Sequence, residues 1–203
     1  MSAPVIKIDP SRPQPELVDQ AAQALLAGAV LVIPTDTVYG IAQLASAAKS
    51  PDELKRIKQR PEEKNIPLLV SCLDDLESCS QDLPGYARSL AAEHWPGALT
   101  LVVRASDRIP PAFRAEDGSV GLRMPNHNFI LAVIALVNTP LVCSSANLSG
   151  QPPATGIDEL SPQIASRVSL IIDGGKINAG QASTVLSCLG TEPQVLRAGP
   201  ITL

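Results

Sequence analysis

The sequence predicts an α/β protein with a mixed β-sheet, and three observations support this class. Short apolar runs typical of strands recur along the chain. Segments in which apolar residues recur at helical spacing separate several of these runs. In the second half, some runs follow one another too closely for crossover helices, so antiparallel pairs must occur there. With 203 residues, of which 45% are hydrophobic, we expect one domain over residues 1–203.

The first predicted elements are a helix over residues 14–28 and a strand directly after it. Leu17, Val18 and Leu25 recur at helical spacing, and Gly28 stands where a left-handed helix cap would lie. The stretch "GAVLVIPTDTVYG" then begins with an apolar run and ends in hydroxyls, a carboxylate and a phenol. This run predicts a buried strand that ends in a polar loop.

The segment 50–61 predicts a short helix with a polar face. Ser50 is the expected N-cap, Pro51 the first helical residue, and Glu53 the partner that completes a capping box. Pro61 prevents the helix from continuing. We expect Lys58 and Arg60 to lie on the polar face near its end.

Later segments supply the remaining strands and one buried helix. The run of nine apolar residues at 129–137 is about half of the roughly 18 that a membrane-spanning helix needs, so it predicts a buried helix. The strand-like runs are "IPLLVS", "ALTLVVR", "SVGLRMP", "PLVCSS", "SLIIDGG", "ASTVLS" and "QVLRAG".

Charge and composition restrict the function classes. A net charge of −4 and a pI near 5.2 oppose a protein that coats nucleic acid through its overall field. Only five aromatic residues occur, too few for the stacking platforms of typical single-strand binders. The four cysteines form no C-x-x-C pair and the N-terminus has no signal-like apolar core, so we expect a cytoplasmic protein.

Polar side chains follow or precede several of the predicted strands. In an open α/β sheet, ligands bind beyond the carboxyl ends of the strands, so these residues are candidates for one shared site. Any one of them alone is better explained as a turn former, since Ser, Thr and Asn satisfy backbone groups there. The candidates are Thr35, Asp36, Thr37, Arg123, Ser144, Ser145, Asn147, Ser183, Thr184 and Arg197.

A second candidate signal is basic. Five of the 16 Lys and Arg residues fall within residues 55–64. A solvated helix face is the usual explanation of such a run. Lys58 and Arg60 lie near the expected helix end, however, from which they can reach a neighbouring loop, and a cationic pair beside hydroxyl-rich strand ends suits a polyphosphate.

Several familiar motifs are missing from the sequence. It contains no G-x-x-x-x-G-K-[ST] and no G-x-G-x-x-G, so any phosphate must be held by other means. His94 and His127 lack metal-ligand spacing, and no serine lies in G-x-S-x-G. We therefore expect no protein metal site, and a lone cysteine such as Cys143 at a strand end is more often a core residue than a nucleophile.

Eight ordered blocks resemble the YrdC/TsaC family of L-threonylcarbamoyladenylate synthases. They are "PTDTVYG", "KQRPEEKNIPL", "WPGALT", "VGLRMPNH", "SSANLSG", "IIDGG", "STV" and "LRAGP", and the match runs over about residues 14–201. The resemblance implies a YrdC-like twisted mixed sheet, flanked by helices, around a positively charged cavity. It also implies synthesis of threonylcarbamoyl-AMP from L-threonine, bicarbonate and ATP with release of pyrophosphate, after which partner proteins modify tRNA. A longer branch of this family adds a C-terminal domain, and this chain resembles the short form.

The resemblance assigns roles to residues by motif. Lys58 and Arg60 match the K-x-R element and are the implied catalytic residues. Together with Ser145 and Asn147 of the S-x-N element and with Arg197, they are the implied ATP-binding residues. Thr35, Arg123 and Ser183 match positions near the threonine pocket. Thr37, Tyr39, Lys64 and Ser144 also match family positions, to which the motifs give no particular contact.

This chemistry requires positioning and charge stabilisation more than covalent work by the protein. We expect Lys58, Arg60 and Arg197 to neutralise developing charge beside a Mg²⁺ held largely by the ATP phosphates. A pocket that hydrogen-bonds the threonine hydroxyl can reject an analogue without it. Such a pocket explains why polar residues crowd the end of the strand at residues 28–33.

Three alternatives remain. One is an RNA-binding or ribosome-associated module, whose RNA affinity would depend steeply on salt; weak RNA binding is open for the synthase too. The second is a paralogue that keeps the fold without adenylate-forming activity. The third, a carbamoyltransferase-type relative, is disfavoured by the length of the chain.

Overall fold

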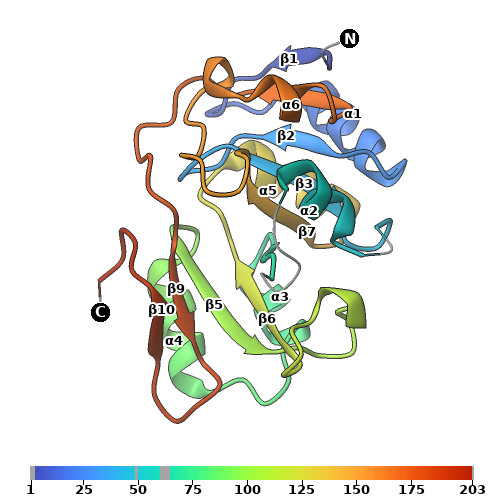
Figure 1. The fold of residues 1–203 in the computed structure, drawn as a ribbon. Coiled ribbons are helices and arrows are strands. Elements are labelled where there is room, and N and C mark those ends of the chain that lie inside the picture. Colours follow the sequence, from blue (N-terminus) through green and yellow to red (C-terminus); the bar gives the residue numbers. More distant parts are fainter. Residues whose placement is uncertain (1–2, 49, 60–64, 203) are drawn as a thin grey trace.

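A computed structural model describes residues 3–48, 50–59 and 65–202 of the chain, and its strands form one mixed sheet (Figure 1). The strand order across the sheet is β1-β8-β2-β3-β7-β4-β6-β5-β9-β10. The strands are β1 (Val5–Lys7), β2 (Leu31–Ile33), β3 (Gly40–Leu44), β4 (Leu68–Leu69), β5 (Leu99–Arg104), β6 (Ser119–Arg123), β7 (Leu141–Ser145), β8 (Leu170–Asp173), β9 (Thr184–Ser187) and β10 (Gln194–Arg197).

Helices cover both faces of this sheet. They are α1 (Pro15–Leu26), α2 (Asp52–Lys58), α3 (Leu73–Ser78), α4 (Gly85–His94), α5 (Asn128–Val137) and α6 (Pro162–Ala165), with 3-10 turns at Pro111–Phe113 and Ile157–Glu159. Helices α1 and α5 pack on β2, β3, β7 and β8 through one hydrophobic cluster. A second cluster on the other face includes residues of α2, α3, α4 and α6. The apolar residues at alternating strand positions therefore serve two cores, as strand geometry requires.

The strand directions divide the sheet into two halves. β7 runs in the same direction as β2, because both are antiparallel to β3. β4 is antiparallel to β7 but parallel to β6, so β6 and β7 run in opposite directions. In Figure 1 the half that contains β2 runs across the view, whereas β5, β6 and β9 run steeply down it. The carboxyl ends of β2 and β7 thus belong to one edge of the sheet and those of β6 and β10 to the other.

Most predicted elements are present. All seven strand-like runs of the second part of the chain form strands, and 129–137 lies in the buried helix α5. Helix α1 ends as predicted: Gly28 has a φ of +84°, its N–H donates to the Leu25 carbonyl, and the Ala29 N–H donates to the Ala24 carbonyl. This pair of bonds is a Schellman motif.

The predicted capping box at α2 is wrong. The helix starts at Asp52 after Pro51, with no side-chain cap. The Ser50 hydroxyl accepts from the Asp52 N–H at 3.4 Å and donates to the Asp52 carboxylate, but the Glu53 carboxylate accepts a hydrogen bond from Gln43 on β3. Gln59 in the left-handed conformation, with a φ of +52°, ends the helix before Pro61, which lies outside the described residues. A tertiary partner has therefore taken the Glu53 side of the predicted box, while Ser50 keeps local bonds.

Within the described ranges, none of the helices combines the length and apolar character needed to cross a lipid bilayer.

Candidate functional site

The candidate site lies where the two halves of the sheet approach each other. One edge supplies the loop after β2 and the end of β7; the other supplies the ends of β6 and β10 and the starts of β5 and β9. A cavity with about 120 Å³ of space that a water molecule can occupy lies between them. Its polar lining residues are Thr35, Thr37, Tyr39, Thr100, Arg123, Ser144, Ser145, Ser183 and Arg197.

Lys58 joins helix α2 to the loop after β7. Its ammonium donates to the backbone oxygen of Ser145, to the Ser145 hydroxyl at 3.3 Å, and to the backbone and side-chain oxygens of Asn147 at 2.7 and 3.1 Å. Asn147 in turn donates from Nδ2 to the carbonyls of Leu148 and Gln151. The structure therefore brings the K-x-R lysine and the S-x-N element into direct contact.

The placement of Lys58 corrects one expectation. Lys58 is only 1% exposed, so it does not lie on a solvated polar face of α2. A buried ammonium needs several oxygen partners to offset its lost hydration, and the loop at Ser145 and Asn147 supplies them. Arg60 and Lys64 lie outside the described residues.

The loop between β2 and β3 is held by a directed chain of hydrogen bonds. A carbonyl can only accept, so the Thr35 hydroxyl donates to Val38 O at 2.7 Å. The Thr37 hydroxyl must then donate to the Thr35 oxygen, 3.0 Å away. It accepts from Arg123 Nη1 at 2.9 Å. Bonds aligned in this way polarise one another, and the backbone N–H groups of Thr37 and Val38 also donate to Thr35.

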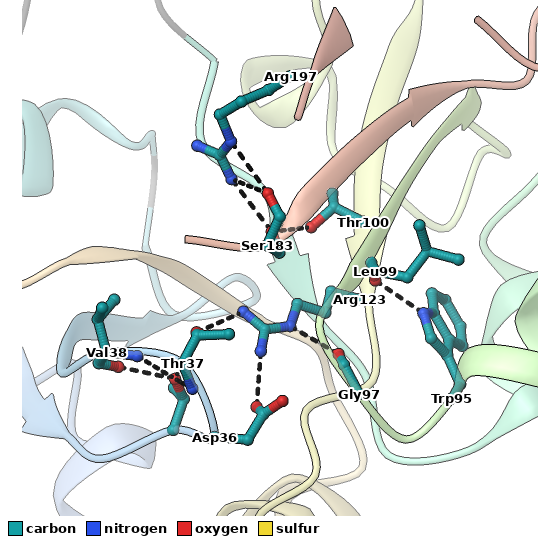
Figure 2. Close-up of polar contacts among 11 residues, drawn as sticks. Asp36, Thr37, Val38, Trp95, Gly97, Leu99, Thr100, Arg123, Ser183 and Arg197 are labelled. Carbon is teal, nitrogen blue, oxygen red and sulfur yellow. Dashed lines mark hydrogen bonds and ion pairs between the residues drawn. The ribbon is translucent and has the colours of Figure 1, made fainter. Parts of the chain in front are cut away.

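Arg123 connects the two halves of the sheet (Figure 2). From the end of β6 its guanidinium reaches the Asp36 carboxylate at 2.6 Å, in an ion pair whose side chains are 8% and 15% exposed. Its Nε donates to the Gly97 carbonyl at 3.0 Å. Trp95 holds this turn by donating from its indole N–H to Leu99 O at 2.8 Å. The bonds of Arg123 use three of its five N–H groups within the described part of the chain, and Arg123 is also a lining residue of the cavity.

A third group of residues faces Arg123 across the cavity. The hydroxyls of Ser183 and Thr100 lie 2.8 Å apart, and Arg197 donates to the backbone and hydroxyl oxygens of Ser183 (Figure 2). No carboxylate pairs with Arg197 among residues 3–48, 50–59 and 65–202. Burial of its guanidinium and the nearby charge of Arg123 both lower the pKa of Arg197. Two guanidinium groups that repel each other across a cavity form a site suited to an anion.

Tyr39 and Cys143 complete the wall without a reactive group. The Tyr39 hydroxyl donates to Gly175 O at 2.7 Å and accepts from the Gly174 N–H, and burial raises its pKa to about 12. Burial likewise raises the pKa of Cys143 to about 12, against the effect of Arg123 and Lys58. A thiol held neutral in this way is a poor nucleophile, which agrees with its interpretation as a core residue.

A second, more apolar cavity opens beside the first. About 450 Å³ of this cavity can be occupied by water, against about 120 Å³ in the first. The two cavities share the lining residues Pro67, Thr100 and Arg197. Its apolar walls come from Ile66, Val102, Phe113, Val120, Val185, Leu189 and Leu196. A polar chamber with two arginines in its lining thus adjoins a larger apolar one.

The donor set does not fit a protein-held metal ion. In the described part of the chain, no three His, Cys, Asp or Glu side chains come together as ligands. Asp36, which lies between the lining residues Thr35 and Thr37, is paired with Arg123. A divalent cation here would need its oxygen ligands from a bound substrate.

Sequence reasoning missed the Gly97 carbonyl and Thr100, and assigned no role to Asp36 beyond its place at a strand end. The block "WPGALT" contains two of these but has no ionisable side chain to mark it. Thr100 could have been suggested by its place at the start of β5, a polar residue in a strand otherwise rich in Leu and Val. Most of the remaining candidates line the cavity, although they come from opposite edges of the sheet rather than from one row of carboxyl ends. Thr184 does not line it, because its hydroxyl donates to the Ile201 carbonyl at 2.9 Å.

Comparison with known proteins identifies relatives of this chain. A family model for Sua5, YciO and YrdC proteins, described as "Telomere recombination", matches residues 23–199. A Bacillus subtilis protein named threonylcarbamoyl-AMP synthase is 37% identical over 187 residues, which cover 90% of this chain and 53% of the relative. The chain thus spans about half the length of that relative.

Two solved structures share the fold over nearly the whole chain. Pyrococcus abyssi Sua5 complexed with L-threonine superposes with a TM-score of 0.90 and 30% identity, covering 96% of this chain and 57% of that one. YciO of E. coli gives a TM-score of 0.89 and 25% identity, covering 98% of this chain and 96% of that one.

Proposed function

Because the chain belongs to the Sua5, YciO and YrdC family, we propose that it makes L-threonylcarbamoyl-AMP from L-threonine, bicarbonate and ATP and releases pyrophosphate. The observation that carries this proposal is that Arg123 and Arg197 line a hydroxyl-rich cavity, while Lys58 bonds Ser145 of the same lining. Several anionic groups could be neutralised there at once. The curated relative's name and the threonine complex of the Pyrococcus structure support the same reaction.

The nucleotide is assigned to the Lys58 side of the cavity and to the apolar chamber. Lys58, Arg60, Ser145, Asn147 and Arg197 would bind ATP, with Lys58 and Arg60 as the catalytic pair. Arg197 adjoins both cavities, so it can reach a phosphate whose nucleoside occupies the apolar space. The aliphatic walls of that space suit the flat faces of a base.

The amino acid is assigned to the smaller polar chamber. Arg123 would offer its remaining N–H groups to the threonine carboxylate, and Ser183 would face it from the opposite wall. Thr35 would act through the loop that it holds, because its hydroxyl already donates to Val38 O. Hydroxyl-rich walls can distinguish threonine from an analogue without a hydroxyl.

The proposed reaction balances without a covalent enzyme intermediate. The threonine amine and bicarbonate give a carbamate and water. A carbamate oxygen then attacks the α-phosphorus of ATP, a new P–O bond forms, and the bond to the β,γ-pyrophosphate breaks. Negative charge grows on the phosphoryl oxygens and on the leaving group, which fixed cations stabilise. Mg²⁺ would enter bound to the ATP phosphates.

The product would then serve tRNA modification through partner proteins, which would transfer the threonylcarbamoyl group to an adenosine. A second candidate function is binding of RNA by the same cationic cavity. The excess of acidic residues over the whole chain disfavours it, and a salt titration of RNA affinity would detect it.

The deciding experiment measures pyrophosphate release with ATP and Mg²⁺, omitting threonine and bicarbonate in turn. We expect release only when both are present. Equal release without threonine, or none with the complete mixture, contradicts the proposal. The latter result would leave a paralogue that keeps the fold without the adenylate chemistry.

A further inference from the structure

Ser144 differs from every other polar side chain that lines the smaller cavity. The hydroxyls or guanidinium groups of the other eight each bond to a protein atom. Among the described residues, the Ser144 hydroxyl has no such partner. Because unpaired buried hydroxyls are uncommon and costly, such a group in a cavity wall needs an explanation.

The Ser144 hydroxyl is open to the cavity rather than sealed in the core. The residue is only 6% exposed. Its oxygen is nevertheless not among the solvent-inaccessible side-chain atoms without a partner, which in the described chain are Gln43 Oε1 and His127 Nδ1. The space it can reach is therefore the cavity that it lines, which has several times the roughly 10–15 Å³ that one water requires.

The surroundings of Ser144 are positive. Its neighbour Ser145 accepts a hydrogen bond from Lys58. The charges of Arg123 and Lys58 both act to lower the pKa of its other neighbour, Cys143, against the larger effect of burial. No carboxylate lines this cavity. A free hydroxyl in such a field donates most favourably to an anionic oxygen.

We propose that the Ser144 hydroxyl donates a hydrogen bond to a carboxylate-type oxyanion bound in the cavity. This inference rests on the proposed function, which supplies two such groups: the carboxylate of L-threonine and bicarbonate. Both are planar and small enough for the chamber, unlike a nucleoside triphosphate. Ser144 is thus a binding residue for the non-nucleotide substrates.

Binding measurements test the inference independently of turnover. Isothermal titration gives the Kd of L-threonine for the full chain and for Ser144→Ala. Melting curves in sodium bicarbonate and in sodium chloride, at equal pH and ionic strength, report bicarbonate binding. We expect Ser144→Ala either to weaken threonine binding about 10-fold or to abolish the rise in Tm that bicarbonate causes. Ser169→Ala, which removes an exposed hydroxyl before β8, is the matched control.

The outcomes separate the two proposals. Loss of threonine affinity assigns the hydroxyl to the amino-acid carboxylate, and loss of the bicarbonate response assigns it to bicarbonate. Unchanged binding of both, or a change confined to the Kd of ATP, overturns the inference. If the wild-type protein binds threonine but releases no pyrophosphate, the proposed function alone is contradicted. The threonine Kd of the wild type can then still be compared with that of Ser144→Ala, so the inference about Ser144 is still tested.

Discussion

The ammonium of Lys58 lies 3.1 Å from the side-chain oxygen of Asn147, although 89 positions separate the two residues in the chain. The same ammonium donates to the Asn147 backbone oxygen at 2.7 Å. Helix α2 and the loop after β7 are therefore joined by one buried cation. This cation both shapes the loop and supplies positive charge beside the cavity.

Lys58→Ala should lower both turnover and stability. Loss of one preorganised charge-stabilising group typically costs about 10²-fold or more in rate. The oxygens left without their donor should reduce the free energy of unfolding by about 1–3 kcal/mol. Pyrophosphate release, measured where circular dichroism shows a folded variant, separates the two effects. Lys176→Ala, at an exposed pair with Glu159, is the control, and unchanged turnover in folded Lys58→Ala would remove Lys58 from the catalytic pair.

Asp36→Ala should destabilise the protein far more than Asp107→Ala. Asp36 neutralises the buried Arg123 at 2.6 Å, whereas Asp107 is 93% exposed and lies 3.5 Å from Arg114. Breaking a buried pair leaves an uncompensated charge and costs about 3–5 kcal/mol, while an exposed pair contributes about 0–1 kcal/mol. Urea unfolding of both variants makes the comparison. Equal midpoints would show that the Asp36 pair contributes no more than an exposed one.

Thr35→Val keeps the shape of the side chain but breaks the hydrogen-bond chain from Arg123 to Val38. We expect the free energy of unfolding to fall by about 1–3 kcal/mol. The KM for threonine should rise more than that for ATP, because the loop lines the polar chamber. Melting curves and steady-state kinetics check both effects, with the exposed Thr191→Val as control. If neither KM changes, Thr35 has only a structural role.

Arg197→Gln should weaken ATP binding with little loss of stability. The guanidinium adjoins both cavities, and its removal relieves repulsion from Arg123. A hydrogen bond to a charged group contributes about 1.5–3 kcal/mol, so the KM for ATP should rise at least about 10-fold. Arg88→Gln, at an exposed pair with Glu77, should leave it unchanged. Equal values in the two variants would place ATP elsewhere.

Stability should fall in alkali, in part through Tyr39. Burial raises the pKa of Tyr39 from 10.0 to about 12. Between these values the unfolded chain has lost the phenolic proton that the folded chain keeps, so unfolding becomes more favourable as pH rises. Tyr39→Phe should reduce this slope in urea-unfolding experiments above about pH 10. An identical slope in wild type and variant would show that other groups, such as Cys143, account for the decline.

Much of the local structure could be predicted because it depends on neighbouring residues. The end of α1 at Gly28 could be predicted because a helix cap of this kind requires only a residue that adopts a positive φ, as Gly28 does. Strands such as β5 and β7 follow from short apolar runs. The capping box predicted at α2 does not form, because the Glu53 carboxylate accepts a hydrogen bond from Gln43, which lies on another element. β1 and β3 went unpredicted, as did α3, α4 and α6.

The sequence by itself determined the element types, the family resemblance and the set of polar residues at strand ends. Only the tertiary structure decided how these residues meet. β4 is antiparallel to β7 and parallel to β6, so Ser145 and Arg123 end strands at opposite edges. The two halves of the sheet lie at a steep angle to each other (Figure 1), and Arg123 on one edge bonds Asp36 on the other. The contacts of Lys58 with Ser145 and of Arg123 with Asp36 each span 87 positions. Hydrophobic periodicity records which face of an element is buried, but it carries no information about contacts between elements so far apart in the chain.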